Sequence, residues 1–202
     1  MKRFIILYAI TIGFSLFIYA QNLSGLDYVS PFHEEMAAVK KGDAWGFINT
    51  DGELVIDFRN DIVVQSDNGV NYPMFNSGRC LISEVKEGIT YFGYIDTKGQ
   101  EVLEPQFLNA TAFNDGLAVV LKLYKNVLGH NDVLDKAMIE YNYMELAINP
   151  KGEIIHYISE KPTHITLSKF FMKGPPSINS KLLTKSLIAV KNDDNKWTIK
   201  KV

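Results

Sequence analysis

Residues 44–58 read AWGFINTDGELVIDF, and this stretch decides the fold class. Two short β-favouring runs, WGFI and ELVI, flank the four residues Asn49-Thr50-Asp51-Gly52. In a type I turn the first side chain accepts a local backbone hydrogen bond, and a glycine in fourth place takes the left-handed conformation. A type I turn followed by such a glycine is a common loop of β-hairpins. The stretch therefore predicts a β-hairpin.

The same turn recurs twice further along the chain. It reads DTKG at residues 96–99 and NPKG at residues 149–152, again with Asn or Asp first and Gly fourth. Proline in second place of the last copy suits the turn, because its fixed φ matches the required value. The preceding runs are FGYI and ELAI, and β-favouring residues follow both turns. The hairpin is therefore a repeated unit.

A second motif precedes each hairpin. It reads FHEEMAAV at residues 32–39, FNSGRCLI at residues 75–82 and FNDGLAVV at residues 113–120. The shared pattern is an aromatic residue, a short polar turn, and alternating small and β-branched residues. A fainter copy, LTKSLIAV at residues 183–190, is followed by another turn at residues 191–196 and by Trp197. The chain thus contains three repeats and a truncated fourth.

We predict an all-β fold in which these tandem β-hairpin repeats pack as an array. One hairpin cannot bury its apolar face alone, so stacked copies supply a continuous core. Trp45 and Phe92 are interpreted as core residues of this array rather than as ligand platforms. Gly46 and Gly93 lie inside the predicted strands, where glycine usually marks a bulge or the close approach of another backbone.

The third repeat carries extra length at about residues 122–143. Val133, Leu134, Ala137 and Met138 fall at helical spacing there, which predicts a short helix. The segment is interpreted either as a tolerated surface loop or as a functional insertion.

The paired motifs resemble the WG repeat family. Trp45-Gly46 is the dipeptide that names the family, Phe92-Gly93 is a common substitute, and EPQF at residues 104–107 resembles the proline-aromatic pair that follows the hairpin. The resemblance covers roughly residues 28–155 and, more weakly, 180–202. It implies a β-rich repeat module, found mostly in bacteria and often in exported proteins, without established catalytic residues. The third hairpin departs from the pattern because Glu145 replaces the aromatic residue.

The resemblance and the turns together define the structural residues of the repeats. These repeat-defining residues are Trp45, Gly46, Asn49, Gly52, Phe92, Gly93, Asp96, Gly99, Asn149 and Gly152.

The N-terminus predicts a signal peptide at residues 1–20. Lys2 and Arg3 precede an apolar run of residues 4–19, and Ala20 stands at a plausible cleavage site. The run is short for a membrane span, although an uncleaved anchor is the alternative. We expect a repeat domain at residues 21–160, followed by a linker and the truncated repeat at residues 161–202. The predicted location is the periplasm or the exterior of the cell.

Charge excludes one class of partner. Cleavage would lower the 21 basic residues to 19, against 23 acidic ones, for a net charge of −4. The basic residues are scattered, so the electrostatic footprint of a nucleic-acid binder is missing.

The sequence contains no recognised catalytic, cofactor-binding or metal-binding constellation. His33-Glu34-Glu35 lacks the second histidine of a zinc-protease helix, and His130, His156 and His164 have no recognised metal spacing. Asp193-Asp194-Asn195 lacks the remaining ligands of a calcium loop and is interpreted as a solvated turn. Cys80 occupies a slot held by alanine in two other copies, which predicts an inert, buried thiol.

We therefore predict a non-catalytic, exported interaction module that binds a protein, a peptide or an envelope glycan, with no cofactor. The alternatives are a hydrolase or other enzyme with a site assembled between repeats, and a purely structural envelope component. Phe170 and Phe171, in the linker at residues 161–180, would form a docking patch if exposed. We expect them instead to be buried as anchors of the linker.

Overall fold

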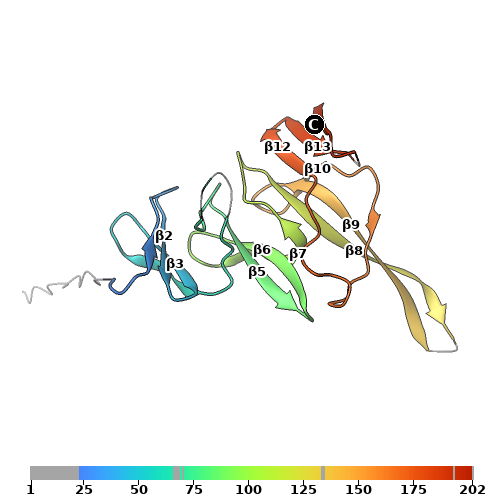
Figure 1. Cartoon of the computed structure of the whole chain (residues 1–202), viewed down its shortest axis with the longest axis horizontal. Helices are drawn as coiled ribbons and strands as arrows, with labels where there is room; N and C mark the ends of the chain where they lie inside the picture. The colour runs from blue at the N-terminus through green and yellow to red at the C-terminus, as the bar shows by residue number, and fades with distance from the viewer. Residues whose placement is uncertain (1–22, 66–68, 70, 133–134, 193, 202) are drawn as a thin grey trace, which may run out of the picture.

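The computed structural model describes residues 23–65, 69, 71–132, 135–192 and 194–201. These residues form strands, turns and loops, and they contain no helix, so the all-β prediction is confirmed. Figure 1 shows an elongated row of small twisted sheets that runs from the first repeat to the last. The predicted signal peptide lies outside the described residues. Within the described residues, no helix is long and apolar enough to cross a membrane.

The first repeat is a four-stranded antiparallel sheet in the order β1-β2-β3-β4. Its strands are β1 (Tyr28–Val29), β2 (Ala37–Lys41), β3 (Ala44–Ile48) and β4 (Leu54–Arg59). The predicted hairpin of residues 44–58 is the pair β3–β4, and β2 is the strand of the preceding motif.

The second and third repeats share one seven-stranded sheet, because β7 pairs with a strand of each repeat. The second repeat contributes β5 (Cys80–Lys86), β6 (Ile89–Ile95) and β7 (Glu101–Ala110). The third contributes β8 (Ala118–Asn131), β9 (Lys136–Ile148) and β10 (Ile154–Tyr157), and β11 (Thr163–His164) also pairs with β9. The fourth repeat is a separate sheet of β12 (Ser180–Thr184), β13 (Leu187–Lys191) and β14 (Trp197–Lys201).

Strand register shows that the four copies are equivalent. Ala38 lies opposite Phe47 in the first repeat, and Leu81 lies opposite Tyr94 in the second. The corresponding pairs are Val119 with Ala147 in the third repeat and Ala189 with Ile199 in the fourth. Since a slip of one residue would move every side chain to the other face, this shared register gives each copy the same two faces.

The core lies mainly between repeats rather than inside them. Phe47 of the first repeat packs in one cluster with Phe75 and Ile82 of the second. Tyr94 of the second repeat packs in the next cluster with Phe113 of the third. A hairpin repeat buries its apolar face against its neighbour, and the buried residues form separate clusters that bridge successive repeats.

The helix predicted within residues 122–143 is wrong. Ala137 and Met138 lie in β9, and the segment extends the hairpin β8–β9 well beyond the sheet, toward the lower right in Figure 1. Val133 and Leu134 lie outside the described residues. Apolar and polar residues alternate over residues 139–143, which indicates a strand, and pairing with β8 outweighs four residues at helical spacing. The exposed apolar side chains of this arm include Val127, Leu128, Met138 and Ile139.

The expected burial of Phe170 and Phe171 is also wrong. Their side chains are 80% and 76% exposed, because the linker forms a tight turn in which the N–H groups of Phe171 and Met172 both donate to the carbonyl of Ser168. The turn directs only Met172 toward the core cluster beneath the linker. The linker is anchored by its aliphatic residues instead, among them Ile165 and Ile178.

Candidate functional site

The three repeat turns have the geometry that their sequences predict. The N–H of Gly52 donates to the carbonyl of Asn49 over 3.0 Å, and Gly99 and Gly152 donate in the same way to Asp96 and Asn149. All three glycines have φ between 76° and 83°.

The first residue of each turn also closes the loop with its side chain. Asn49 Oδ1 accepts hydrogen bonds from the N–H groups of Asp51 and Glu53, over 3.1 and 2.9 Å. Asp96 and Asn149 accept the same pair of bonds in their copies. These residues are therefore structural parts of the turn.

The fourth repeat contains a version of this turn without glycine. Asn192 Oδ1 accepts from the N–H of Lys196, and Asn195 takes the left-handed place with φ of 61°. Asparagine tolerates that conformation better than most residues. Asp194 belongs to this turn, as the solvated-turn interpretation requires, and Asp193 lies outside the described residues.

The turn glycines of the second and third repeats are contact points between repeats. A Cβ atom on Gly99 would lie 3.3 Å from Ile56 of the first repeat, and one on Gly152 would lie 2.5 Å from Leu103 of the second. Ile56 and Leu103 occupy the same place in successive copies, four residues after the turn glycine. Gly52, in the first repeat, has nothing within 4 Å of the corresponding point.

The strand glycines lie under a neighbouring backbone. A Cβ atom on Gly46 would lie 2.8 Å from the carbonyl oxygen of Ile56, and one on Gly93 would lie 2.4 Å from that of Leu103. The adjacent aromatic residues Trp45 and Phe92 are buried, with 6% and 9% of their surface exposed. In each repeat the aromatic residue therefore fills the core, and the glycine lets the backbone of the next antiparallel strand come close.

The third repeat replaces this aromatic residue with Glu145, for which the sequence predicted a departure from the repeat pattern but no role. Glu145 is 6% exposed, and its carboxylate accepts hydrogen bonds from the Ser180 hydroxyl and the Asn179 N–H. It therefore ties the fourth repeat to the third. A carboxylate at a position that is aromatic in other copies was the available signal.

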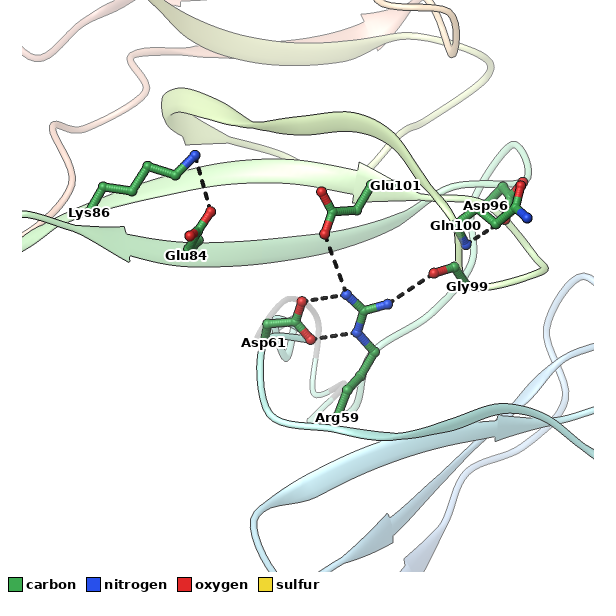
Figure 2. A network of polar contacts seen from close by, with 8 residues as sticks. All are labelled: Arg59, Asp61, Glu84, Lys86, Asp96, Gly99, Gln100 and Glu101. Carbon is green, nitrogen blue, oxygen red and sulfur yellow. Dashed lines mark hydrogen bonds and ion pairs between the residues drawn. The ribbon is translucent and has the colours of Figure 1, made fainter.

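A network of polar contacts joins the first two repeats (Figure 2). Arg59 makes a bidentate ion pair with Asp61, at 2.6 Å from Nε and 2.5 Å from the terminal nitrogen. Its other terminal nitrogen donates to the carbonyl oxygen of Gly99 over 3.0 Å. Glu101 Oε1 lies 4.0 Å from the terminal nitrogen that pairs with Asp61. The hydrogen bond to Asp61 raises the pKa of Arg59. The network fixes the second turn on the first repeat.

Cys80 and the histidines do not converge. Cys80 is fully buried, and burial raises the pKa of its thiol. His33 Nδ1 lies 2.7 Å from the carbonyl oxygen of Phe75, whereas His130 and His164 pair with Asp135 and Glu140 on the β8–β9 arm. Among the described residues, no group of three or more His, Cys, Asp or Glu side chains is placed to hold a metal ion.

A cleft of about 660 Å³ spans the second, third and fourth repeats. Its walls come from residues 63–65, from Met74 and Asn76, from residues 109–114, and from residues 180–182 of β12. These segments precede or form the first strand of successive repeats, so the cleft follows the axis of the array. Its lining mixes apolar and polar side chains, and Lys181 is the titratable side chain among the lining residues described.

Polar groups of the cleft divide into two sets. Asn109 donates to the carbonyl of Pro176, and Thr111 accepts from the N–H of Val119, so both are engaged in the fold. The side chains of Asn76, Asn114 and Lys181 have no hydrogen-bond partner among the described residues. Asn76 and Asn114 each follow the first aromatic residue of their motif, so two free amides recur one repeat apart.

A family model described as the WG containing repeat matches residues 26–43, 45–59 and 92–125. The matches cover the first repeat and the part of the second and third that runs from β6 into β8. The resemblance to that family is confirmed over these stretches. No curated protein and no solved structure gives a significant match.

Proposed function

We propose that this WG repeat protein is a non-catalytic binding module that holds an extended polypeptide in the cleft across its second, third and fourth repeats. The carrying observation is the pair Asn76 and Asn114, two unengaged amides that recur one repeat apart on the wall of one cleft. An amide side chain can both donate to and accept from a peptide backbone. Repetition at a fixed interval is suited to a ligand that is itself repetitive, as a peptide backbone is.

The lining favours a peptide over a glycan. Apolar walls from Val64, Met74 and Leu182 can receive side chains that alternate along an extended segment. The aromatic residues of the lining, Phe92 and Phe113, are 9% and 2% exposed. They therefore present little ring surface for a sugar to stack on. Lys181 favours a neutral or acidic segment.

The lining also supports binding rather than catalysis. Acid-base or nucleophilic chemistry needs at least two reactive side chains within reach of one substrate atom. The cleft residues described include one titratable side chain, Lys181. Export to the cell envelope is part of the proposal, and its support is the basic, apolar and small-residue pattern of residues 1–20.

The binding proposal is tested with a displayed library of random twelve-residue peptides, selected on the purified chain. Selected peptides are expected to lose about tenfold in affinity for Asn76→Ala, Asn114→Ala and Lys181→Ala, measured by calorimetry. Asn126→Ala, on the exposed β8–β9 arm, is the matched control and should bind as wild type. Peptides that bind all four variants equally, or binding of envelope glycans alone, would overturn the proposal.

Export is tested by N-terminal sequencing of the chain recovered from its native compartment. A start near Gln21 is expected. A product that retains Lys2 and Arg3 contradicts cleavage.

A further inference from the structure

Each repeat has two faces that are used differently. The outgoing face is the one that packs on the next repeat, and it carries Phe47 in the first repeat and Tyr94 in the second. The incoming face receives it, through Phe75 in the second repeat and Phe113 in the third. The ring centroids of these two pairs lie 4.7 and 4.8 Å apart. The same contact is therefore made twice.

The fourth repeat has an outgoing face that no described residue covers. By register, Trp197 and Ile199 are the equivalents of Trp45 and Phe47, yet they are 55% and 64% exposed, whereas Trp45 is 6% exposed. Lys191 lies 5.9 Å from the Trp197 ring, much as Lys40 lies 5.7 Å from the Trp45 ring in the first repeat. Exposed apolar side chains gathered on one face are a feature of interaction surfaces.

The incoming face of the first repeat is correspondingly exposed, because no described repeat packs on it. Phe32 is 52% exposed, whereas its equivalents Phe75 and Phe113 are 0% and 2% exposed. Gly52 likewise has open space where Gly99 meets Ile56 of the preceding repeat. In the fourth repeat Leu182 packs inward in place of the aromatic residue, since the register shifts between Leu182 and Thr184.

The two ends also carry opposite charge. Residues 23–62 contain eight acidic and three basic side chains, a net charge of −5. Residues 180–201 contain six basic and two acidic side chains, a net charge of +4.

The turns at the two ends suggest a specific charged contact. Inside the chain, Glu34 accepts hydrogen bonds from the N–H groups of Ser77 and Gly78 in the next turn, over 2.7 and 2.8 Å. Lys185 holds the place of Glu34 in the fourth repeat, and the turn it would meet on a first repeat is Glu34-Glu35.

We propose that the fourth repeat of one copy of this chain stacks on the first repeat of a second copy, with Ile199 against Phe32 and Lys185 beside Glu34-Glu35. The contact continues the interface already present between repeats. It is heterologous, so it leaves one free end of each kind and can extend into a chain of copies. The cleft of the proposed binding function is a separate surface, and the two proposals stand independently.

The test uses two variants that each block one end. Trp197→Asp places a charge on the outgoing face, and Phe32→Asp places one on the incoming face; both positions are more than half exposed, so the fold should persist by circular dichroism. In analytical ultracentrifugation, wild type is expected to form concentration-dependent oligomers and each variant alone to remain monomeric. An equimolar mixture of the two variants retains one intact pair of faces and should form a dimer and nothing larger. The matched control is Phe171→Asp, an equally exposed aromatic residue off both faces, which should assemble as wild type.

A charge exchange tests the orientation of the contact. Lys185→Glu is expected to weaken association about tenfold, and Lys185→Glu with Glu35→Lys to restore most of it. Wild type that remains monomeric at high concentration, or a mixture of blocked variants that gives no dimer, would overturn the proposal.

Discussion

Phe47 packs edge-on against Phe75, with ring centroids 4.7 Å apart, although 28 positions separate them and they belong to different repeats. Tyr94 and Phe113 repeat this relationship one unit later, at 4.8 Å. The first three repeats are therefore joined by one aromatic contact used at equivalent positions. Predictions about stability follow from which residues take part in contacts between repeats.

The three turn glycines should differ in tolerance to alanine although their φ values are alike. Gly52→Ala meets open space and should cost only the left-handed penalty, about 1 kcal/mol in the free energy of unfolding. Gly152→Ala adds a clash with Leu103 and should cost about 2–4 kcal/mol, with Gly99→Ala between them. Urea unfolding measures all three. Equal losses would show that the contact between repeats contributes nothing at these turns.

Gly93→Ala should be among the most damaging small substitutions in the chain. Its Cβ would lie 2.4 Å from the Leu103 carbonyl oxygen and 2.7 Å from the Pro105 nitrogen, and neither backbone atom can move alone. We expect a loss above about 3 kcal/mol or failure to fold. Gly129→Ala is the control, because it lies in a strand and meets only the flexible end of Met138. The midpoint temperature of thermal unfolding of Gly129→Ala should equal that of wild type or lie slightly above it.

Cys80 should make the stability of the protein depend on alkaline pH. Burial raises the pKa of the folded thiol above its ordinary value of about 8.5, so the folded state keeps a proton that the unfolded state loses. The folded state then binds more protons, and the free energy of unfolding falls as pH rises through that value.

Cys80→Ala should reduce this fall, since Ala37 and Ala118 hold the same slot without loss of packing. Unfolding curves at neutral and alkaline pH measure the difference. A second readout is labelling by a thiol reagent, which should require unfolding. Rapid labelling of the native chain would contradict the assignment of Cys80 to the core.

The Arg59–Asp61 pair should be coupled more strongly than an ordinary surface pair. It is bidentate and about three quarters buried at Arg59, and it supports the bond to Gly99. A double-mutant cycle with Arg59→Met and Asp61→Asn should give a coupling free energy of about 1 kcal/mol or more. Lys86–Glu84, an exposed pair in the same view of Figure 2, is the reference and should give less.

The predictable parts of the fold are those fixed by local chemistry. Asn49 and Gly52 predict a turn. Asn49 has a side chain that accepts the local hydrogen bond, and glycine adopts the left-handed conformation at little cost. Repetition at Asp96 and Asn149 then identifies the unit. Trp45 is buried, in keeping with its interpretation as a core residue.

The parts that sequence reasoning missed depend on contacts between distant segments. Four residues at helical spacing suggested a helix near Ala137, but pairing of β9 with β8 along most of its length outweighs that local preference. Phe170 and Phe171 were expected to be buried, and only the direction of the Ser168 turn shows that they are not. Asn76 and Asn114 could not be predicted as binding residues from sequence, because they come together only in the cleft that three repeats form.

The central claim is that the first three repeats stack through equivalent aromatic pairs. It is tested most directly by double-mutant cycles on Phe47→Leu with Phe75→Leu and on Tyr94→Leu with Phe113→Leu, followed by urea unfolding. The account predicts a coupling free energy of about 0.5–1.5 kcal/mol within each pair and close to zero for the crossed combination of Phe47 with Phe113. Coupling absent within the pairs, or as large in the crossed combination, would contradict it.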